Sequence, residues 1–318
     1  MSLIEKILQR EEFKEKPPVL IDIGASNSIN PKWKKIAKYS ICIAFEADNR
    51  DIDFVEKKSK DYKKLFLFNK IVIDNDNKEI DFYLTKFPYC SSVLKPDSKA
   101  LEDWVFSNMF EVNEVKKFAS IKLNDVLNEL DLTYVDWFKT DSQGIDLRLF
   151  KSLGKNITDK ILAAEFEPGI LDSYNGEDKL HELMQYMDTQ PFWMSDIGVK
   201  GVQRISKNLI EIYFNGEENY ILASSMKTAP GWAEVTYTND LTNADLFDIR
   251  DYLLSIVFAL IDKQYGFAFD VSVKANEKFK DPLFEELNNY LKKKINNYLL
   301  KQKALKVPKS IIRRLKGK

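Results

Sequence analysis

The sequence predicts an α/β fold with a mostly parallel, doubly wound sheet and a C-terminal helical extension. Short apolar runs typical of buried strands alternate with helix-like segments over residues 17–215, which is the pattern of parallel strands joined by crossover helices. The alternation ends after about residue 225, where long helical stretches follow. We therefore expect a sheet domain at residues 1–225 and a mainly helical extension with a basic tail at residues 226–318.

The expected elements follow in chain order. A charged helix over residues 1–16 precedes the first strand. Strands are expected at 19–24, 41–47, 65–73, 77–87, 118–122, 134–141, 159–168, 191–198 and 208–215. Helices are expected at 31–40, 50–64, 97–110, 145–154, 176–190, 243–264 and 281–305, with a short one capped by Asn124 or Asp125. Residues 224–235 are expected to form a loop.

The charge is unevenly distributed along the chain. The 318 residues carry a net charge of -1, yet residues 287–318 hold eleven Lys and Arg and no Asp or Glu. This tail is expected either to be a solvated helix end or to contact an anionic membrane surface. A nucleic-acid partner is not expected, because the rest of the chain is acidic.

No segment predicts export or a membrane span. Residues 1–16 mix charges into a helical period, unlike a signal peptide. The longest apolar run has ten residues, 252–261, whereas a span needs about 20. Two cysteines, Cys42 and Cys90, are too few for a disulfide scaffold or a zinc site. A cytoplasmic location is expected, with the tail as the candidate for contact with the inner face of the membrane.

Two residues at strand ends suggest a nucleoside site. Ligands of an open parallel sheet bind beyond the carboxyl ends of its strands. Gly24 ends the first strand and Glu46 ends the second, 22 residues later. An acid at about this distance can accept hydrogen bonds from both hydroxyls of a ribose. An adenosine-bearing cofactor is therefore expected.

The turn after the first strand distinguishes between such cofactors. A dinucleotide needs G-x-G-x-x-G, but Ser26 and Ile29 occupy the second and third glycine positions. No G-K-[ST] follows, so a P-loop is excluded. S-adenosylmethionine carries no phosphate, and Asp22 could bind its ammonium group while Glu46 binds its ribose. A nicotinamide oxidoreductase remains a weaker alternative.

The stretch "YVDWFKTDSQGIDLRLFKSL" at residues 134–153 resembles the strand-to-helix signature of the FkbM family of S-adenosylmethionine-dependent methyltransferases. That signature is a hydrophobic residue followed by D-x-x-K-x-D-x-E-G. The matching positions here are Asp136, Lys139, Asp141, Gln143 and Gly144. Further motifs match in order: "IDIGASNS", "AFEADNR", "NKIVIDNDNKEIDFYL", "CSSVL", "IKLNDVL" and "AAEFEPG".

The resemblance covers about residues 17–215 and implies a class I, Rossmann-like methyltransferase that O-methylates a sugar or glycan precursor. It implies a cofactor site built from Asp22, Gly24, Ala25, Ser26, Glu46, Asn69 and Asp141. Gln143 replaces the family's usual Glu, so Gln143→Glu is expected to be tolerated. A non-catalytic glycan-assembly partner with the same fold is the alternative.

The catalytic candidates are carboxylates, because the chain has a single histidine, His181, in a predicted helix. Asp141, and Glu165 or Glu167 on the next strand, could accept the proton of an acceptor hydroxyl. Lys139 could act with them or pair with one of them. No residue spacing requires a metal ion. A sugar-stacking wall is a further hypothesis, formed by Trp104, Phe106, Phe110, Phe192, Trp193 and Trp232.

Overall fold

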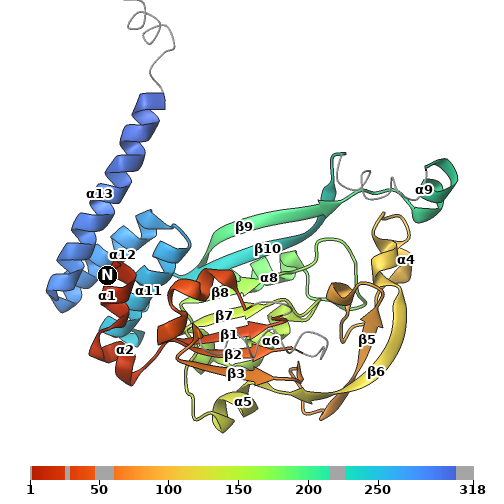
Figure 1. Cartoon of the computed structure of the whole chain (residues 1–318), viewed down its shortest axis with the longest axis horizontal. Helices are drawn as coiled ribbons and strands as arrows, with labels where there is room; N and C mark the ends of the chain where they lie inside the picture. The colour runs from red at the N-terminus through yellow and green to blue at the C-terminus, as the bar shows by residue number, and fades with distance from the viewer. Residues whose placement is uncertain (1, 26–28, 47–60, 215–225, 306–318) are drawn as a thin grey trace, which may run out of the picture. The chain divides into compact units, whose positions relative to one another are not determined.

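The structure is a computed structural model that describes residues 2–25, 29–46, 61–214 and 226–305. The chain forms two compact units, Met1–Leu246 and Phe247–Lys318. Figure 1 shows the strands in the first unit and the helices α11, α12 and α13 in the second.

A seven-stranded sheet is the centre of the first unit (Figure 1). Across the sheet the strands are β3 (Lys64–Phe68), β2 (Ile41–Phe45), β1 (Val19–Ile23), β7 (Trp137–Thr140), β8 (Ala163–Phe166), β10 (Ala229–Asn239) and β9 (Phe192–Val202). The first five run parallel, and β10 runs antiparallel to both β8 and β9. The predicted α/β fold with a mostly parallel sheet is confirmed. Between β1 and β7 the strand order changes direction, which is where such sheets bind ligands.

Alternation along the strands gives the sheet two different faces. Ile21, Ile43 and Phe138 point into the main apolar core, which also contains residues of α5 (Leu123–Glu129), α6 (Asp146–Ser152) and α8 (Leu180–Met187). Successive side chains of a strand point to opposite faces. Asp22 and Lys139 therefore lie on the other face, where Trp33 packs edge-to-face on Trp137.

A smaller, three-stranded sheet is formed by the part of the chain between β3 and β7 of the main sheet. Its order is β4 (Ile71–Val72), β6 (Val112–Ile121) and β5 (Glu79–Thr85). The strand expected at 65–73 is thus divided between the two sheets. After β5 come the 3-10 helix η5 (Pro88–Cys90), α4 (Ser98–Leu101) and the 3-10 helix η6 (Ser107–Phe110), so residues 97–110 are only partly helical.

The remaining elements of the first unit are short. They are α1 (Leu3–Leu8), α2 (Glu11–Glu15), η1 (Pro31–Lys35), η2 (Ala37–Tyr39), α7 (Lys155–Thr158), α9 (Lys207–Tyr213) and η7 (Ala244–Leu246). The strand expected at 208–215 is the helix α9, because a short apolar run fits either period. Most of the helix expected at 50–64 lies outside the described residues.

The first unit extends to Leu246, beyond the boundary expected at residue 225. The reason is β10, which occupies part of the expected loop at 224–235. Pro230 and Gly231 near its start are typical of a turn. The register shift between Pro230 and Trp232 accommodates them in the strand.

The second unit is helical, as expected for the C-terminal extension. It contains α11 (Ile249–Ile261), α12 (Tyr265–Phe279) and α13 (Pro282–Leu305). α11 includes the apolar run at 252–261, and its side chains are buried on all sides. Among the described helices, none combines the length and the apolar character needed to cross a membrane. α12 was not predicted. It ends at Lys280, whose backbone is left-handed with φ 53°.

Candidate functional site

Four neighbouring parallel strands end directly before a glycine or an acid. These residues are Gly24 after β1, Glu46 after β2, Asp141 after β7 and Glu167 after β8. Because the strands are parallel, all four lie at the same edge of the sheet. The edge therefore collects three carboxylates around the point where the strand order changes direction.

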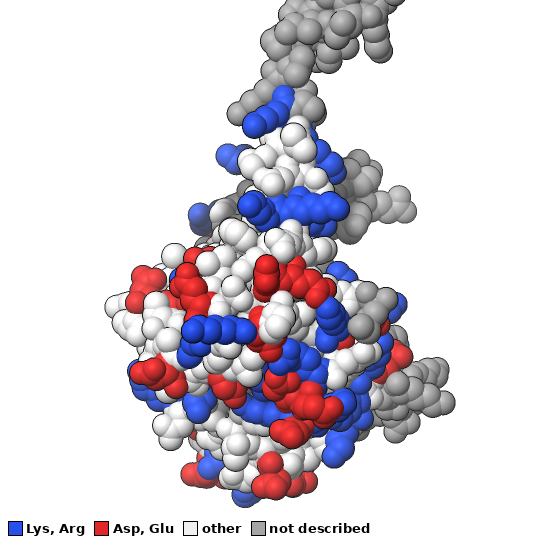
Figure 2. All heavy atoms as spheres, turned by 90° about the vertical axis from the view of Figure 1, so that its left-hand side faces the viewer, with Lys and Arg blue, Asp and Glu red and all other residues white. Residues whose placement is uncertain are grey.

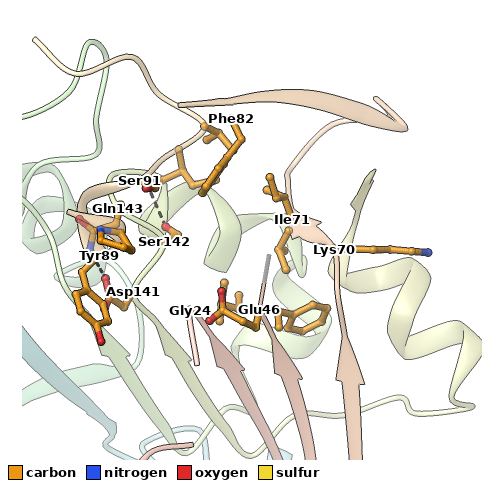
Figure 3. Close-up of a pocket in the computed structure, with 16 residues that line it drawn as sticks. Gly24, Glu46, Lys70, Ile71, Phe82, Tyr89, Ser91, Asp141, Ser142 and Gln143 are labelled. Atoms are coloured by element: carbon orange, nitrogen blue, oxygen red, sulfur yellow. Dashed lines mark hydrogen bonds between the residues drawn. The ribbon is translucent and has the colours of Figure 1, made fainter. Parts of the chain in front are cut away.

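A cavity with about 850 Å³ of space, partly open to solvent, lies at this edge (Figure 3). Gly24, Glu46 and Asp141 line it from the main sheet. Phe82, Tyr89 and Ser91, from β5 and the segment after it, line it from another side. Lys70 also belongs to the wall, but Figure 3 shows its side chain pointing away from the two acids. Three of the expected cofactor residues thus line one cavity.

Gly24 brings two strand ends into contact. Its φ is +75°, and an added Cβ would lie 2.2 Å from the carbonyl oxygen of Asp141. Any other residue would be strained and would displace Asp141. The Gly24 and Ala25 amides both donate to the carbonyl of Phe45, at 3.2 Å each. This turn thus connects the ends of β1, β2 and β7.

Asp22 forms an ion pair with Lys139 and is absent from the cavity wall. The two residues are opposite each other in β1 and β7, with 2.9 Å between Lys139 Nζ and Asp22 Oδ1. The other Asp22 oxygen accepts from the Asn30 amide at 2.9 Å, and the residue is fully buried. Asp22 is thus paired within the protein, and its expected contact with a cofactor ammonium group stays a prediction.

Lys139 is held in its charged form. Burial alone would lower its pKa, but the charges of Asp22 and Asp141 raise the pKa overall. Its Nζ also lies 3.4 Å from the carbonyl oxygen of Gly24. A permanently protonated amine cannot accept a proton, so the geometry favours a structural role for Lys139 over a catalytic one.

Glu165 continues this row of polar residues on β8, opposite Lys139. Its carboxylate accepts from Trp137 Nε1 at 2.9 Å and from Asn30 Nδ2 at 3.2 Å. Lys32 Nζ lies 3.4 Å from it. Glu165 is therefore committed to contacts within the protein, and it does not line the cavity.

Ala25 and Asn69 are not part of the cavity wall. Ala25 is 1% exposed and directed into the protein. Asn69 directly follows β3 and is exposed, while the wall beside it is built by Lys70 and Ile71. Ser26 lies outside the described residues.

Asp141 is the first member of a hydrogen-bonded chain. Gln143 Nε2 donates to Asp141 Oδ1 at 2.5 Å, and Gln143 Oε1 accepts from the Tyr174 hydroxyl at 3.0 Å. The Gln143 backbone is left-handed, with φ 56°, and its carbonyl accepts from Ser92 Oγ at 2.7 Å. Burial raises the pKa of Asp141, an effect that Lys139 opposes.

Glu165 and Glu167 were alternative catalytic candidates, and the structure gives Glu167 different surroundings from those of Glu165. Burial and the neighbouring charges of Asp141 and Asp146 raise the pKa of Glu167 to about 8. Within the described part of the chain, no hydrogen bond or ion pair engages its carboxylate, although Glu167, like Glu165, is not part of the cavity wall. A carboxylate of this kind suits a general base near neutral pH.

Asp146 was missed by the sequence analysis and holds the edge together. It is 2% exposed. Its carboxylate accepts from Thr140 Oγ1 at 3.0 Å, from the Ser142 amide at 2.9 Å and from the Glu167 amide at 2.8 Å. The ends of β7 and β8 are thereby fixed to the start of α6. Its position in the first turn of a helix after a strand was the available signal.

The expected aromatic wall forms only in part. Phe106 stacks on Trp232 at 6.5 Å between ring centroids and contacts Phe110 edge-to-face at 5.1 Å. Phe110 in turn packs against Tyr174 at 5.5 Å. The other three are elsewhere: Phe192 contacts Phe150 in the core, Trp104 lies beside Arg204, and Trp193 belongs to β9.

No family model matches the chain, and no curated protein sequence is significantly similar to it. Within the described ranges, no group of three or more His, Cys, Asp or Glu side chains could hold a metal ion. Function is therefore inferred from the geometry and charge of the edge.

Lys139→Met should lower the free energy of unfolding by about 3–5 kcal/mol, because Asp22 would keep a buried charge without its counter-ion. Urea denaturation measures this change. Lys160→Met removes an exposed lysine and is the control. The double variant Asp22→Asn/Lys139→Met should recover much of the loss. Wild-type stability of Lys139→Met would contradict the importance of the pair.

Gln143→Glu should lower stability at pH 8 by about 1–3 kcal/mol, reversing the tolerance expected from the sequence. The amide donates to Asp141, whereas a second carboxylate must share a proton with it. A shared proton raises the folded-state pKa, so stability is kept near pH 5 and lost as the pH rises. Thermal denaturation at both pH values tests this, with the exposed Gln185→Glu as control. Equal stability of Gln143→Glu and wild type at pH 8 would refute it.

Proposed function

We propose that the chain is a class I, Rossmann-like, S-adenosylmethionine-dependent methyltransferase that O-methylates a hydroxyl group. The observation that carries this proposal is the set of three carboxyl groups, Glu46, Asp141 and Glu167, at one edge of the sheet, two of which line the cavity. The sugar or glycan class of the acceptor is taken from the resemblance to the FkbM family.

The charge of the edge favours a cationic ligand. Lys139 is already paired with Asp22, and the pKa values of Asp141 and Glu167 are both raised. Burial is the main cause of both rises, and a cation bound nearby would favour the charged form of both carboxyl groups. A ligand with a sulfonium and an ammonium group supplies positive charge, whereas the pyrophosphate of a nicotinamide dinucleotide adds negative charge. The edge therefore supports S-adenosylmethionine over the dinucleotide.

The fold and the position of Glu46 support an adenosine site. The five parallel strands have the relative order of the first five strands of a Rossmann sheet. Glu46 lies at the end of the strand next to β1 and lines the cavity, where an acid accepts hydrogen bonds from ribose hydroxyls. Gly24, Glu46 and Asp141 would hold the cofactor.

The residues of the edge can perform the proton transfer that methylation of a hydroxyl requires. When bound, S-adenosylmethionine would supply the methyl group, and the sulfur would keep the electron pair of the broken bond. Glu167 would take the proton of the attacking hydroxyl, because its carboxylate has a pKa near neutrality. Gln143 holds Asp141 in place through its hydrogen bond. Alignment of the acceptor hydroxyl with the methyl group would account for most of the remaining rate acceleration.

Glu46→Ala should weaken S-adenosylhomocysteine binding more than tenfold, which is about 1.5–3 kcal/mol, because two hydrogen bonds to ribose are lost. Isothermal titration measures this affinity. Glu129→Ala removes an exposed acid and is the control. Wild type should also bind S-adenosylmethionine more tightly than the uncharged product. Unchanged affinity in Glu46→Ala would refute the ribose contact, and absence of binding to either ligand would refute the cofactor.

The affinity for S-adenosylmethionine should rise with pH through the titration of Glu167. Its pKa of about 8 means that the side chain is neutral at pH 6.5 and mostly charged at pH 8.5, where it attracts a cation. In Glu167→Gln, the rise in affinity between pH 6.5 and pH 8.5 should be about fivefold smaller than in wild type, which is equivalent to roughly 1 kcal/mol. Both proteins are titrated with the same ligand at both pH values, so the ligand's own ionisation contributes equally and drops out of the comparison. The same pH dependence in wild type and Glu167→Gln would exclude Glu167 from the site.

A further inference from the structure

The helix α13 has two different halves. It contains 24 residues, Pro282–Leu305. In its first half Leu283, Phe284, Leu287 and Leu291 are buried at 0–8% exposure. In its second half Tyr298, Leu299 and Leu300 are 48%, 52% and 62% exposed. Large apolar side chains thus face solvent at the end of a helix whose beginning is firmly packed.

The apolar stripe of the packed half continues into the exposed half. Successive helical residues are about 100° apart, so Ile295 and Tyr298 lie on nearly the same side as Leu287 and Leu291, whereas Leu299 and Leu300 are turned away from that side. Tyr298 contacts Tyr265 of α12 with 5.8 Å between ring centroids. α12 therefore supports the stripe as far as Tyr298, and Leu299 and Leu300 lie outside it, in solvent.

Lysines flank this stripe on both sides. By helical position, Lys292 and Lys303 lie beside Leu299, while Lys294 and Lys301 lie beside Tyr298. Lys293 adds a fifth positive charge, and residues 287–305 contain no Asp or Glu. Figure 2 shows basic side chains around this part of α13 and no acidic one on the visible face. Exposed apolar groups surrounded by lysines are typical of helices that lie in a membrane interface.

We propose that residues 292–303 of α13 form a docking surface for an anionic lipid bilayer. The lysines would bind lipid phosphates, and Leu299 and Leu300 would enter the boundary between head groups and acyl chains. A nucleic acid would use the lysines but leave the leucines in water. A second copy of the helix would bring like charges together. A lipid surface uses both features, and this proposal is independent of the methyltransferase activity.

Vesicle cosedimentation of the full chain tests the surface. Wild type should bind vesicles of phosphatidylcholine with phosphatidylglycerol at 0.1 M salt, bind pure phosphatidylcholine weakly, and lose affinity at 1 M salt. Replacing Lys292, Lys293, Lys294, Lys301 and Lys303 by Gln should weaken binding at least about 30-fold, equivalent to two engaged lysines. The matched control replaces five exposed lysines of the first unit, Lys34, Lys35, Lys116, Lys117 and Lys160. It has the same net charge and should bind like wild type.

A second variant separates lipid from nucleic acid. Leu299→Ser/Leu300→Ser keeps every charge, so it should weaken vesicle binding and leave any binding to a duplex oligonucleotide unchanged. Circular dichroism verifies that each variant keeps its helix content. Three results would each overturn the proposal: no binding of wild type to anionic vesicles, equal binding by the five-lysine variant and its control, or unchanged vesicle binding by the leucine variant.

Discussion

The ion pair between Asp22 and Lys139 makes the partly buried lysine of the central strands the counter-ion of Asp22. It connects the central strands β1 and β7 at the point where the strand order changes direction. Since the ammonium group of Lys139 pairs with Asp22, it acts on the carboxyl groups of Asp141 and Glu167 only through its electrostatic field. Burial raises the pKa values of both groups, and the charge of Lys139 opposes the rise. The edge of the sheet thus gathers partly buried carboxyl groups beside a lysine that is already paired.

This edge is rigid in spite of its repulsive charges. Asp146 fixes the ends of β7 and β8 through amide and hydroxyl donors, and the missing side chain of Gly24 lets its turn lie against Asp141. Gln143 adds a donor to Asp141 without adding charge. Carboxylates held close together and poorly compensated are common at ligand sites, because the ligand completes the electrostatics. The same network also explains why an amide at position 143 suits this chain.

The sequence predicted those features that depend on strand ends. Gly24, Glu46 and Asp141 were assigned to one edge because the residue after a parallel strand must lie there. The sequence could not predict which residues of neighbouring strands lie opposite each other. The register that places Asp22 and Glu165 opposite Lys139 is set by tertiary packing. Glu165 and Glu167 have the same alternation, yet Trp137 and Asn30 engage only the first. β10 was missed because Pro230 and Gly231 conceal a strand that a register shift makes possible.

The charge of the edge bears on turnover as well as on binding. In the proposed reaction, methyl transfer converts a sulfonium into an uncharged thioether. The carboxylates of Glu46, Asp141 and Glu167 would then lose the positive charge that they attracted, and the product would be held less tightly than the substrate. Meanwhile Glu167 would carry the proton of the acceptor, which reduces the repulsion at the edge. The negative charge of such a site would be balanced by the cationic substrate but not by the uncharged thioether, and this difference would favour product release.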